Sequence, residues 1–331
     1  MDVKTAKEYL QRRISPGETH DDLLSFPRFI EIETVNACNA RCPMCTIDEW
    51  TRKTPIIKDA LFDKLAGELI ENADLVTRVS LYRDGEPLLD KKLADRVARL
   101  KEGGIRETAI STNVSLLDER RARDLLEAGL GLIILSIDSL KKDVFEAIRL
   151  RLTFEEVLEN ALRFIELRDR INPGTKISVR MIRQESNLDE WDDYHAFWAP
   201  KLKPGHDRVY FHNIFNWGNQ LNGFSPIASS LEPRLPCVAL WSLMVIFANG
   251  EVPLCNVDFN DKYPTGSVAE KSIAEVWQSE VLNERRRLHL TGNKAKISLC
   301  DNCNVWDEPP GPGNVSSRYV DQVDAVALAT T

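Results

Sequence analysis

The chain has 331 residues, of which 43% are hydrophobic and 28% charged, and its 43 Lys and Arg against 51 Asp and Glu give a formal net charge of −8. This length accommodates one large domain and a smaller one, and the acidic balance argues against nucleic acid or an acidic membrane surface as a partner. The N-terminus lacks the apolar run of a signal peptide and no stretch approaches the roughly 20 apolar residues of a membrane span, so we expect a soluble, cytoplasmic protein.

Short apolar strands alternate with amphipathic helical patterns between about residues 28 and 215. The predicted strands cover 29–34, 75–82, 105–112, 132–138, 176–182 and 208–214, and the clearest helical patterns cover 58–73, 116–129 and 154–170. Such alternation predicts a parallel sheet with right-handed crossovers. Because six units fall short of the eight of a complete TIM barrel, we predict an α/β fold with a partial (β/α)6 TIM-like barrel.

Three of the seven cysteines lie within eight residues, directly after the first predicted strand. No fourth ligand lies near Cys38, Cys42 and Cys45, whereas structural zinc is held by four protein ligands. Three thiolates can hold three irons of a [4Fe–4S] cluster and leave the fourth iron open to a small molecule. The spacing therefore favours an open iron–sulfur cluster over zinc or a thioredoxin-type dithiol.

The motif Cys38-x-x-x-Cys42-x-x-Cys45 resembles the signature of the radical S-adenosylmethionine (SAM) enzymes, and later segments at successive strand ends agree with this family over roughly residues 28–215. The residues that the resemblance assigns to SAM are Met44, Gly85, Glu86, Pro87, Ser111, Asn113, Ser136, Asp138 and Arg149. It implies Met44 beside the adenine, Gly85-Glu86-Pro87 at the amino group, and Arg149 at the carboxylate. Asp84 departs from the family, because many members carry glycine at that position.

The implied chemistry is cleavage of SAM on the reduced cluster to methionine and a 5′-deoxyadenosyl radical, which abstracts hydrogen from the substrate. The resemblance also implies an electron donor such as flavodoxin or ferredoxin.

Several predicted strands carry polar residues on one face. Arg180 alternates with apolar residues in 176–182, and Tyr210 and His212 do so in 208–214. A parallel strand buried on both faces would be apolar throughout, so a polar face indicates either a barrel interior that holds a polar ligand or a solvent-facing sheet. The residues expected in the interior are Tyr82, Arg180, Tyr210, His212, Asn213 and Asn216.

The pattern changes after about residue 225. Residues 243–255 predict a hairpin that turns at Asn249-Gly250, and 272–290 predict one or two helices. The other four cysteines are Cys237, Cys255, Cys300 and Cys303, and their spacing suits either a complete second [4Fe–4S] cluster or structural zinc. Glu275-Val276-Trp277, placed between the hairpin and the last cysteines, resembles the twitch domain, a short form of the SPASM domain, which implies the cluster.

We therefore predict an N-terminal extension (1–27), a radical SAM core (28–225), a small α+β auxiliary iron–sulfur domain (226–310) and a C-terminal tail (311–331). The cofactors would be two [4Fe–4S] clusters and SAM. This assignment leaves no cysteine spare, since three plus four uses all seven.

The cysteine count bears on the reaction. In the enzymes that the chain resembles, epimerases usually return a hydrogen atom from a free thiol, whereas dehydrogenases lose a proton and pass the remaining electron to the auxiliary cluster. We therefore expect oxidation, as in the twitch-type alcohol dehydrogenases of aminocyclitol and aminoglycoside antibiotic pathways (butirosin and spectinomycin type), which implies a secondary alcohol of an amino sugar that becomes a ketone. The alternatives are a radical SAM epimerase of a sugar or peptide, with Tyr210 as hydrogen donor, and a non-catalytic zinc and iron–sulfur protein.

Three interior residues are candidates for contact with the substrate. His212 would take the hydroxyl proton, since the pKa of histidine lies near neutrality, and Arg180 would orient the hydroxyl. Tyr210 completes the catalytic candidates. The other histidines, His20, His195, His206 and His289, are expected at the surface.

Overall fold

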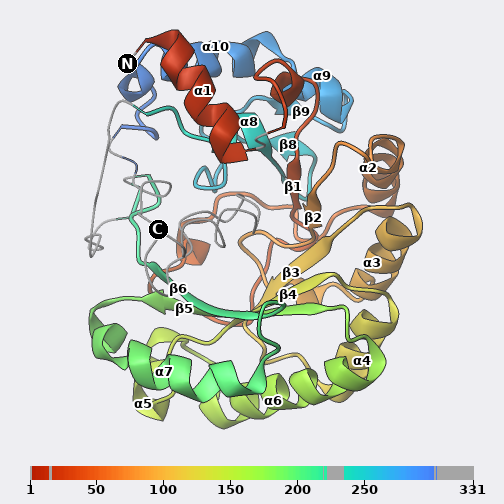
Figure 1. Ribbon diagram of the computed structural model, residues 1–331, viewed down its shortest axis with the longest axis vertical. Helices are drawn as coiled ribbons and strands as arrows, with labels where there is room; N and C mark the ends of the chain where they lie inside the picture. The colour runs from red at the N-terminus through yellow and green to blue at the C-terminus, as the bar shows by residue number, and fades with distance from the viewer. Residues whose placement is uncertain (1, 15–16, 219, 222–234, 302, 304–331) are drawn as a thin grey trace.

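The computed structural model describes residues 2–14, 17–218, 220–221, 235–301 and 303. Its centre is a parallel sheet of seven strands in the order β6-β5-β4-β3-β2-β1-β7 (Figure 1). The strands are β1 (Phe29–Ile32), β2 (Arg78–Ser80), β3 (Thr108–Thr112), β4 (Leu132–Ser136), β5 (Lys176–Arg183), β6 (Arg208–Asn213) and β7 (Leu243–Ile246). The first six are the predicted strands, of which five are shorter than predicted and β5 is one residue longer, so the α/β fold class is confirmed.

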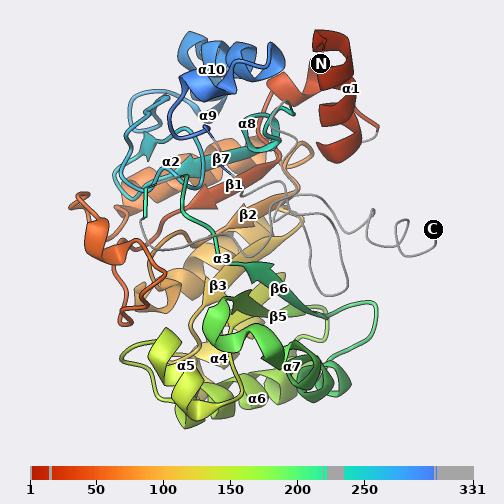
Figure 2. The same cartoon turned by 90° about the vertical axis from the view of Figure 1, so that its left-hand side faces the viewer.

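Helices follow the strands in chain order, as right-handed crossovers require. They are α2 (Asp59–Glu71), α3 (Leu93–Glu102), α4 (Glu119–Glu127), α5 (Lys142–Ile148), α6 (Phe154–Ile171) and α7 (Trp191–Trp198), with short 3-10 turns that include η3 (Pro87–Leu89). The remaining elements are α1 (Val3–Ile14), α8 (Ala239–Ser242), β8 (Glu251–Val252), β9 (Gly266–Ser267), α9 (Ile273–Trp277) and α10 (Glu280–Leu290). Figure 2 shows α5, α6 and α7 at one end of the molecule and α1, α9 and α10 at the other.

The predicted hairpin over 243–255 is wrong in its pairing. Its turn exists, with Gly250 at φ +92° and its N–H bonded to the Phe247 carbonyl, 2.8 Å away. However, β7 pairs in parallel with β1, from Phe29 beside Leu243 to Ile32 beside Ile246, while β8 pairs antiparallel with β9. The physical reason is burial on both faces, since all four residues of β7 are buried and apolar, as in a parallel strand whose two faces are both covered.

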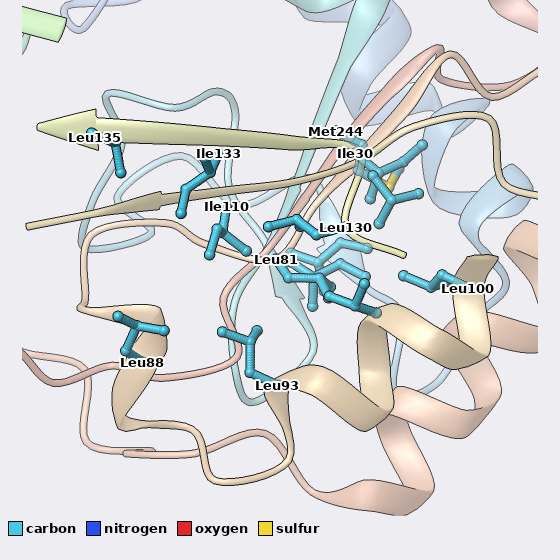
Figure 3. Packing of buried hydrophobic residues seen from close by; sticks show 14 of the residues in the cluster. Ile30, Leu81, Leu88, Leu93, Leu100, Ile110, Leu130, Ile133, Leu135 and Met244 are labelled. Carbon is cyan, nitrogen blue, oxygen red and sulfur yellow. The ribbon is translucent and has the colours of Figure 1, made fainter. Parts of the chain in front are cut away.

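The main core lies between the sheet and its helices and fixes the orientation of the site strands. Figure 3 shows Ile110 of β3 and Ile133 of β4 facing Leu93 and Leu100 of α3. Because side chains alternate along a strand, Ser136 and Arg180 fall on the opposite face of the sheet from these residues. None of the helices in the described ranges is long and apolar enough to cross a membrane.

Candidate functional site

A cavity lies at the carboxyl ends of the parallel strands, the edge at which α/β sheets bind ligands. Its lining draws on segments from residue 31 to residue 217. The predicted residues that line it are Cys38, Cys42, Met44, Cys45, Tyr82, Gly85, Glu86, Ser111, Asn113, Ser136, Arg149 and Arg180. The structure thus brings together the three-cysteine motif, the strand-end segments that follow it, and one of the three catalytic candidates.

Other predicted residues are not among those that line this cavity in the described part of the chain. Pro87 is buried at the start of η3, and Asp138 lies behind Arg149. Tyr210 and His212 on β6 lie beside Arg180 and Ile182 on β5, so they share the sheet face of Arg180. The rings of Tyr210 and His212 contact each other edge to face, with their centroids 5.2 Å apart. Their assignment to the substrate stays a prediction, as do those of Asn213 and Asn216.

Glu86 is 2% exposed, and its carboxylate ties the loop after β2 to the end of β3. Its Oε1 accepts from the Thr112 hydroxyl at 2.8 Å and from the Leu88 N–H at 3.0 Å, and its Oε2 accepts from the Asn113 N–H at 2.8 Å. Burial raises the pKa of Glu86, and these three donors oppose that effect. An ionised carboxylate has about four acceptor positions, so one remains for a cationic group in the cavity, which fits the amino group of SAM.

Gly85 lets this loop lie directly against the chain that precedes Cys38. A Cβ at Gly85 would lie 2.2 Å from the Val35 carbonyl oxygen and 2.6 Å from that of Ala37. The next N–H, of Glu86, donates to the Ala37 carbonyl at 2.8 Å. The residue type at position 85 therefore sets the distance between the predicted SAM loop and the cysteine motif.

Arg149 supplies a fixed cation to the cavity. Its Nε donates to Asp138 Oδ2 at 2.6 Å, and Asp138 Oδ1 accepts from the Ile182 N–H at 2.7 Å. Burial disfavours the charged form of Arg149, but the attraction of Asp138 acts in the opposite direction, and the pKa of Arg149 lies above its ordinary value. The Arg149 Nη1 also lies 3.8 Å from Cys42 Sγ, so a carboxylate bound to Arg149 would lie close to the three cysteines.

The three thiols suit a metal rather than free acid–base chemistry. Burial raises the pKa of Cys38 to about 11 and that of Cys45 to about 12, and it also raises the pKa of Cys42. Because the thiolate is the form that binds iron, a cluster in this loop would replace the protons that burial favours. The donor set fits an open iron–sulfur cluster.

The other four cysteines line a second cavity together with Pro236, Val257, His289, Lys294 and Leu299. Burial raises the pKa of Cys237 and Cys255 well above the ordinary value. Among the described residues, no three His, Cys, Asp or Glu side chains converge closely enough to hold a single metal ion. A zinc ion would require its sulfurs about 2.3 Å away, whereas the ligands of a cluster bind different irons.

His289 and His20 are buried, so the expectation that they lie at the surface is wrong. His289 is 1% exposed in the second cavity, where burial lowers its pKa to about 3, and His20 accepts a hydrogen bond from Trp241 Nε1 at 3.0 Å. The signal for His289 was present in the sequence. Leu282, Arg286 and His289 recur at the spacing of one helix face, and all three are buried on α10.

The chain segment that follows β6 lies between the two cavities. Trp217 lines the first cavity, and its indole N–H donates to the Met44 carbonyl at 3.1 Å. The adjacent Gly218 lies against Leu299 and Val257, both of which line the second cavity. A single stretch of backbone therefore separates the two cysteine sets at this point.

Asp84, the departure from the family pattern, belongs to a buried ion network that the sequence did not reveal. Its carboxylate lies 2.7 Å from Arg83 Nη1 and 3.5 Å from Arg52 Nη2. Arg83 donates to the Asn256 carbonyl, and Arg52 Nε donates to the Phe259 carbonyl at 2.6 Å. The network thus ties the end of β2 to the segment that follows Cys255.

Two family models match the chain. The radical SAM superfamily matches residues 32–190, which hold the first three cysteines, and an iron–sulfur cluster-binding domain, SPASM, matches residues 237–304, which hold the other four. Domains of these kinds bind SAM and iron–sulfur clusters, which confirms the predicted cofactors.

The chain is similar to the S-adenosyl-L-methionine-dependent 2-deoxy-scyllo-inosamine dehydrogenase of Niallia circulans. They are 24% identical over 299 residues, which cover 90% of this chain and 97% of the relative. It is also similar to the GTP 3′,8-cyclase of Limosilactobacillus fermentum, with 28% identity over 283 residues that cover 83% of this chain and 74% of the cyclase.

Solved structures share the architecture. BtrN in complex with AdoMet and 2-DOIA matches with a TM-score of 0.58 and 21% identity, over 89% of this chain and 98% of BtrN. Native anSMEcpe with bound AdoMet matches with a TM-score of 0.62 and 15% identity, over 88% of this chain and 94% of anSMEcpe. At these identities the likeness concerns the fold, a parallel α/β sheet followed by a small iron–sulfur domain.

Proposed function

Because this chain is a radical SAM protein with a C-terminal SPASM-type iron–sulfur domain, we propose that it oxidises a secondary alcohol of an aminocyclitol or amino sugar to a ketone. The proposal rests mainly on how the seven cysteines are divided, since three line the first cavity and four line the second. No cysteine is then left to return a hydrogen atom to the substrate, which speaks against the epimerase alternative. The similarity to a dehydrogenase of an inosamine over nearly its whole length supports the substrate class.

When bound, SAM and the first cluster supply a 5′-deoxyadenosyl radical that abstracts hydrogen, and the second cluster supplies an acceptor for the electron left on the substrate. The chain's own residues bind SAM and orient the substrate. In this proposal the free acceptor position of Glu86 takes the amino group of SAM, and the Asp138-held guanidinium of Arg149 takes its carboxylate.

Arg180 is our candidate for orienting the substrate hydroxyl. Its Nη2 donates to Ser136 Oγ at 2.7 Å and lies 3.3 Å from Ser111 Oγ, which fixes the guanidinium in the cavity lining. Its Nε is buried and has no hydrogen-bond partner within the described ranges, so a donor remains for a ligand oxygen. His212, beside the cavity residue Ile182, remains the proposed base for the hydroxyl proton.

The test is an anaerobic assay of the reconstituted protein with a panel of aminocyclitols, read by mass spectrometry. We expect about eight irons per chain, a product lighter by two hydrogens, and one SAM consumed per product. Solvent deuterium at a carbon of a product of unchanged composition would instead establish epimerisation.

The second cysteine set has its own prediction. Replacing Cys255 with Ala removes one ligand of the electron acceptor, so SAM cleavage should persist while ketone formation stops and iron falls by about four per chain. Val257→Ala, which changes the same cavity without removing sulfur, is the matched control and should retain both iron and product. Full turnover by the Cys255 variant would show that the second site is only structural.

A further inference from the structure

His289 is a polar side chain in the lining of the second cavity, which otherwise consists of the four thiols, apolar residues and Lys294. It projects from α10, is 1% exposed, and lines the cavity together with all four cysteines of the second set. The iron–sulfur ligands proposed above do not require it, since four thiolates complete a cluster. Its role therefore needs a separate explanation.

The hydrogen bond to one ring nitrogen determines where the proton lies on the other. The Cys237 backbone N–H donates to His289 Nδ1 at 3.1 Å, so Nδ1 is an acceptor and carries no hydrogen. The ring proton must then reside on Nε2. This Nε2 is fully buried and has no hydrogen-bond partner among the described residues.

A buried N–H without an acceptor is destabilising, and native structures rarely contain one. The cavity that His289 lines is where four thiolates would gather around iron, and thiolate and sulfide sulfurs are hydrogen-bond acceptors. His20 offers a contrast from the same region. It is also buried and its ring also lies against Trp241, but its Nε2 already accepts a hydrogen bond from the Trp241 indole N–H.

We propose that His289 is a positioning and tuning residue, whose Nε2–H donates to a sulfur of the auxiliary cluster held by Cys237, Cys255, Cys300 and Cys303. The inference rests on the part of the proposed function that places an iron–sulfur cluster in this cavity. A hydrogen bond to a cluster sulfur stabilises the reduced, more negative state and so raises the reduction potential. The cluster then becomes a better acceptor for the electron that the oxidised alcohol leaves behind.

The test is an EPR-monitored redox titration of the full-length, reconstituted protein, with and without His289. We expect His289→Leu to keep four auxiliary irons but lower the equilibrium constant for their one-electron reduction roughly tenfold, a shift of about 59 mV. His289→Gln, whose amide can still donate, should remain close to the wild-type potential. His20→Gln, a buried histidine outside the cysteine cavity, is the matched control and should not shift the potential.

An unchanged potential in His289→Leu, with the cluster present, would overturn the proposal. Loss of the cluster in both His289 variants would also overturn it, because the side chain would then be structural or an iron ligand. Loss in His289→Leu alone, with His289→Gln at the wild-type potential, would support the donor role. The titration needs no substrate, so absence of ketone product in the assay above would refute the proposed reaction without touching this result.

Discussion

At Gly85 the predicted SAM loop lies directly against the chain that precedes the cysteine motif. Replacing it with Ala would place a Cβ 2.2 Å from the Val35 carbonyl oxygen, a contact that backbone atoms cannot accommodate without moving. We expect Gly85→Ala to displace the loop that carries Glu86 and to weaken SAM binding tenfold or more, since misplacement by about 1 Å can cost about a hundredfold in rate. Equilibrium binding of SAM to the reconstituted protein measures this.

The matched control is Gly67→Ala on α2, where a Cβ would meet nothing within 4 Å. Because alanine is the better helix residue, this variant should gain about 0.5–1 kcal/mol in stability and keep wild-type SAM affinity. Equal SAM affinity in both variants would mean that the loop position does not govern binding.

At the residue scale, the sequence revealed what is local. The motif Cys38-x-x-x-Cys42-x-x-Cys45 and the strand-end segments could be located because each is a short pattern in fixed order. It did not reveal partners brought together by folding, such as Thr112 with Glu86 or Arg52 with the Phe259 carbonyl. Those contacts join residues 26 and 207 positions apart, and composition carries no signal for them.

At the element scale, six strands were predictable because each alternates with a helical segment, and the seventh was not. Asn249-Gly250 is a strong hairpin signal, and it does mark a turn. The pattern could not show that β1 has a free edge, to which β7 adds in parallel. The sequence therefore predicted the turn correctly, whereas the pairing of β7 depended on the unpaired edge of β1, which only the folded sheet reveals.

The segment after β6 is the element on which the separation of the two cavities depends. Gly218 has φ +63°, and a Cβ there would lie 2.8 Å from both the Leu299 carbonyl oxygen and its Cδ1. We expect Gly218→Ala to push the chain around Cys300 away from the wall, lowering auxiliary iron and ketone yield while SAM cleavage continues. Iron analysis and the ratio of ketone to cleaved SAM measure the effect.

Gly205 provides the comparison, because it has φ +73° and open space around its Cβ position. Both alanine variants incur the cost of a left-handed backbone, about 1–2 kcal/mol, but only Gly218→Ala adds the clash. If Gly205→Ala lost auxiliary iron to the same extent, backbone strain rather than contact with Leu299 would be the cause.

At the scale of the whole molecule, the N-terminal segment packs on the C-terminal part. Helix α1 contacts α8 and α10, and the Trp277 indole N–H on α9 donates to the Leu23 carbonyl at 3.1 Å. The predicted division into an extension, a core, an auxiliary domain and a tail remains a prediction. What the sequence could not show is that α1, Leu23 and β7 tie the beginning of the chain to its auxiliary part.

The opposite end of the molecule is secured by a buried ion pair between α6 and the loop before β6. Asp207 accepts two hydrogen bonds from Arg168, at 2.8 and 2.6 Å, and one each from the backbone N–H groups of Ile177 and Lys203. Both side chains of the pair are fully buried. Burial opposes the charge of Asp207, but the hydrogen bonds from Arg168 and the backbone outweigh it and lower its pKa to about 2.

Asp207→Asn should therefore destabilise the protein by about 3 kcal/mol at pH 7, because the charged and buried Arg168 loses its buried counter-ion and keeps only the half-exposed Asp169, 2.7 Å from its Nε. The folded-state pKa lies below the unfolded value of about 3.9, so the wild-type advantage is fully present above that value and is lost as the pH falls from about 4 to about 2. Urea unfolding, followed by circular dichroism from pH 7 to pH 3, should show the two stability curves converging at the acid end.

Asp124→Asn, which breaks an exposed pair with Arg120, should cost less than about 1 kcal/mol. A difference between wild type and the Asp207 variant that stayed constant down to pH 3 would show that packing, not the carboxylate charge, is what the substitution removes.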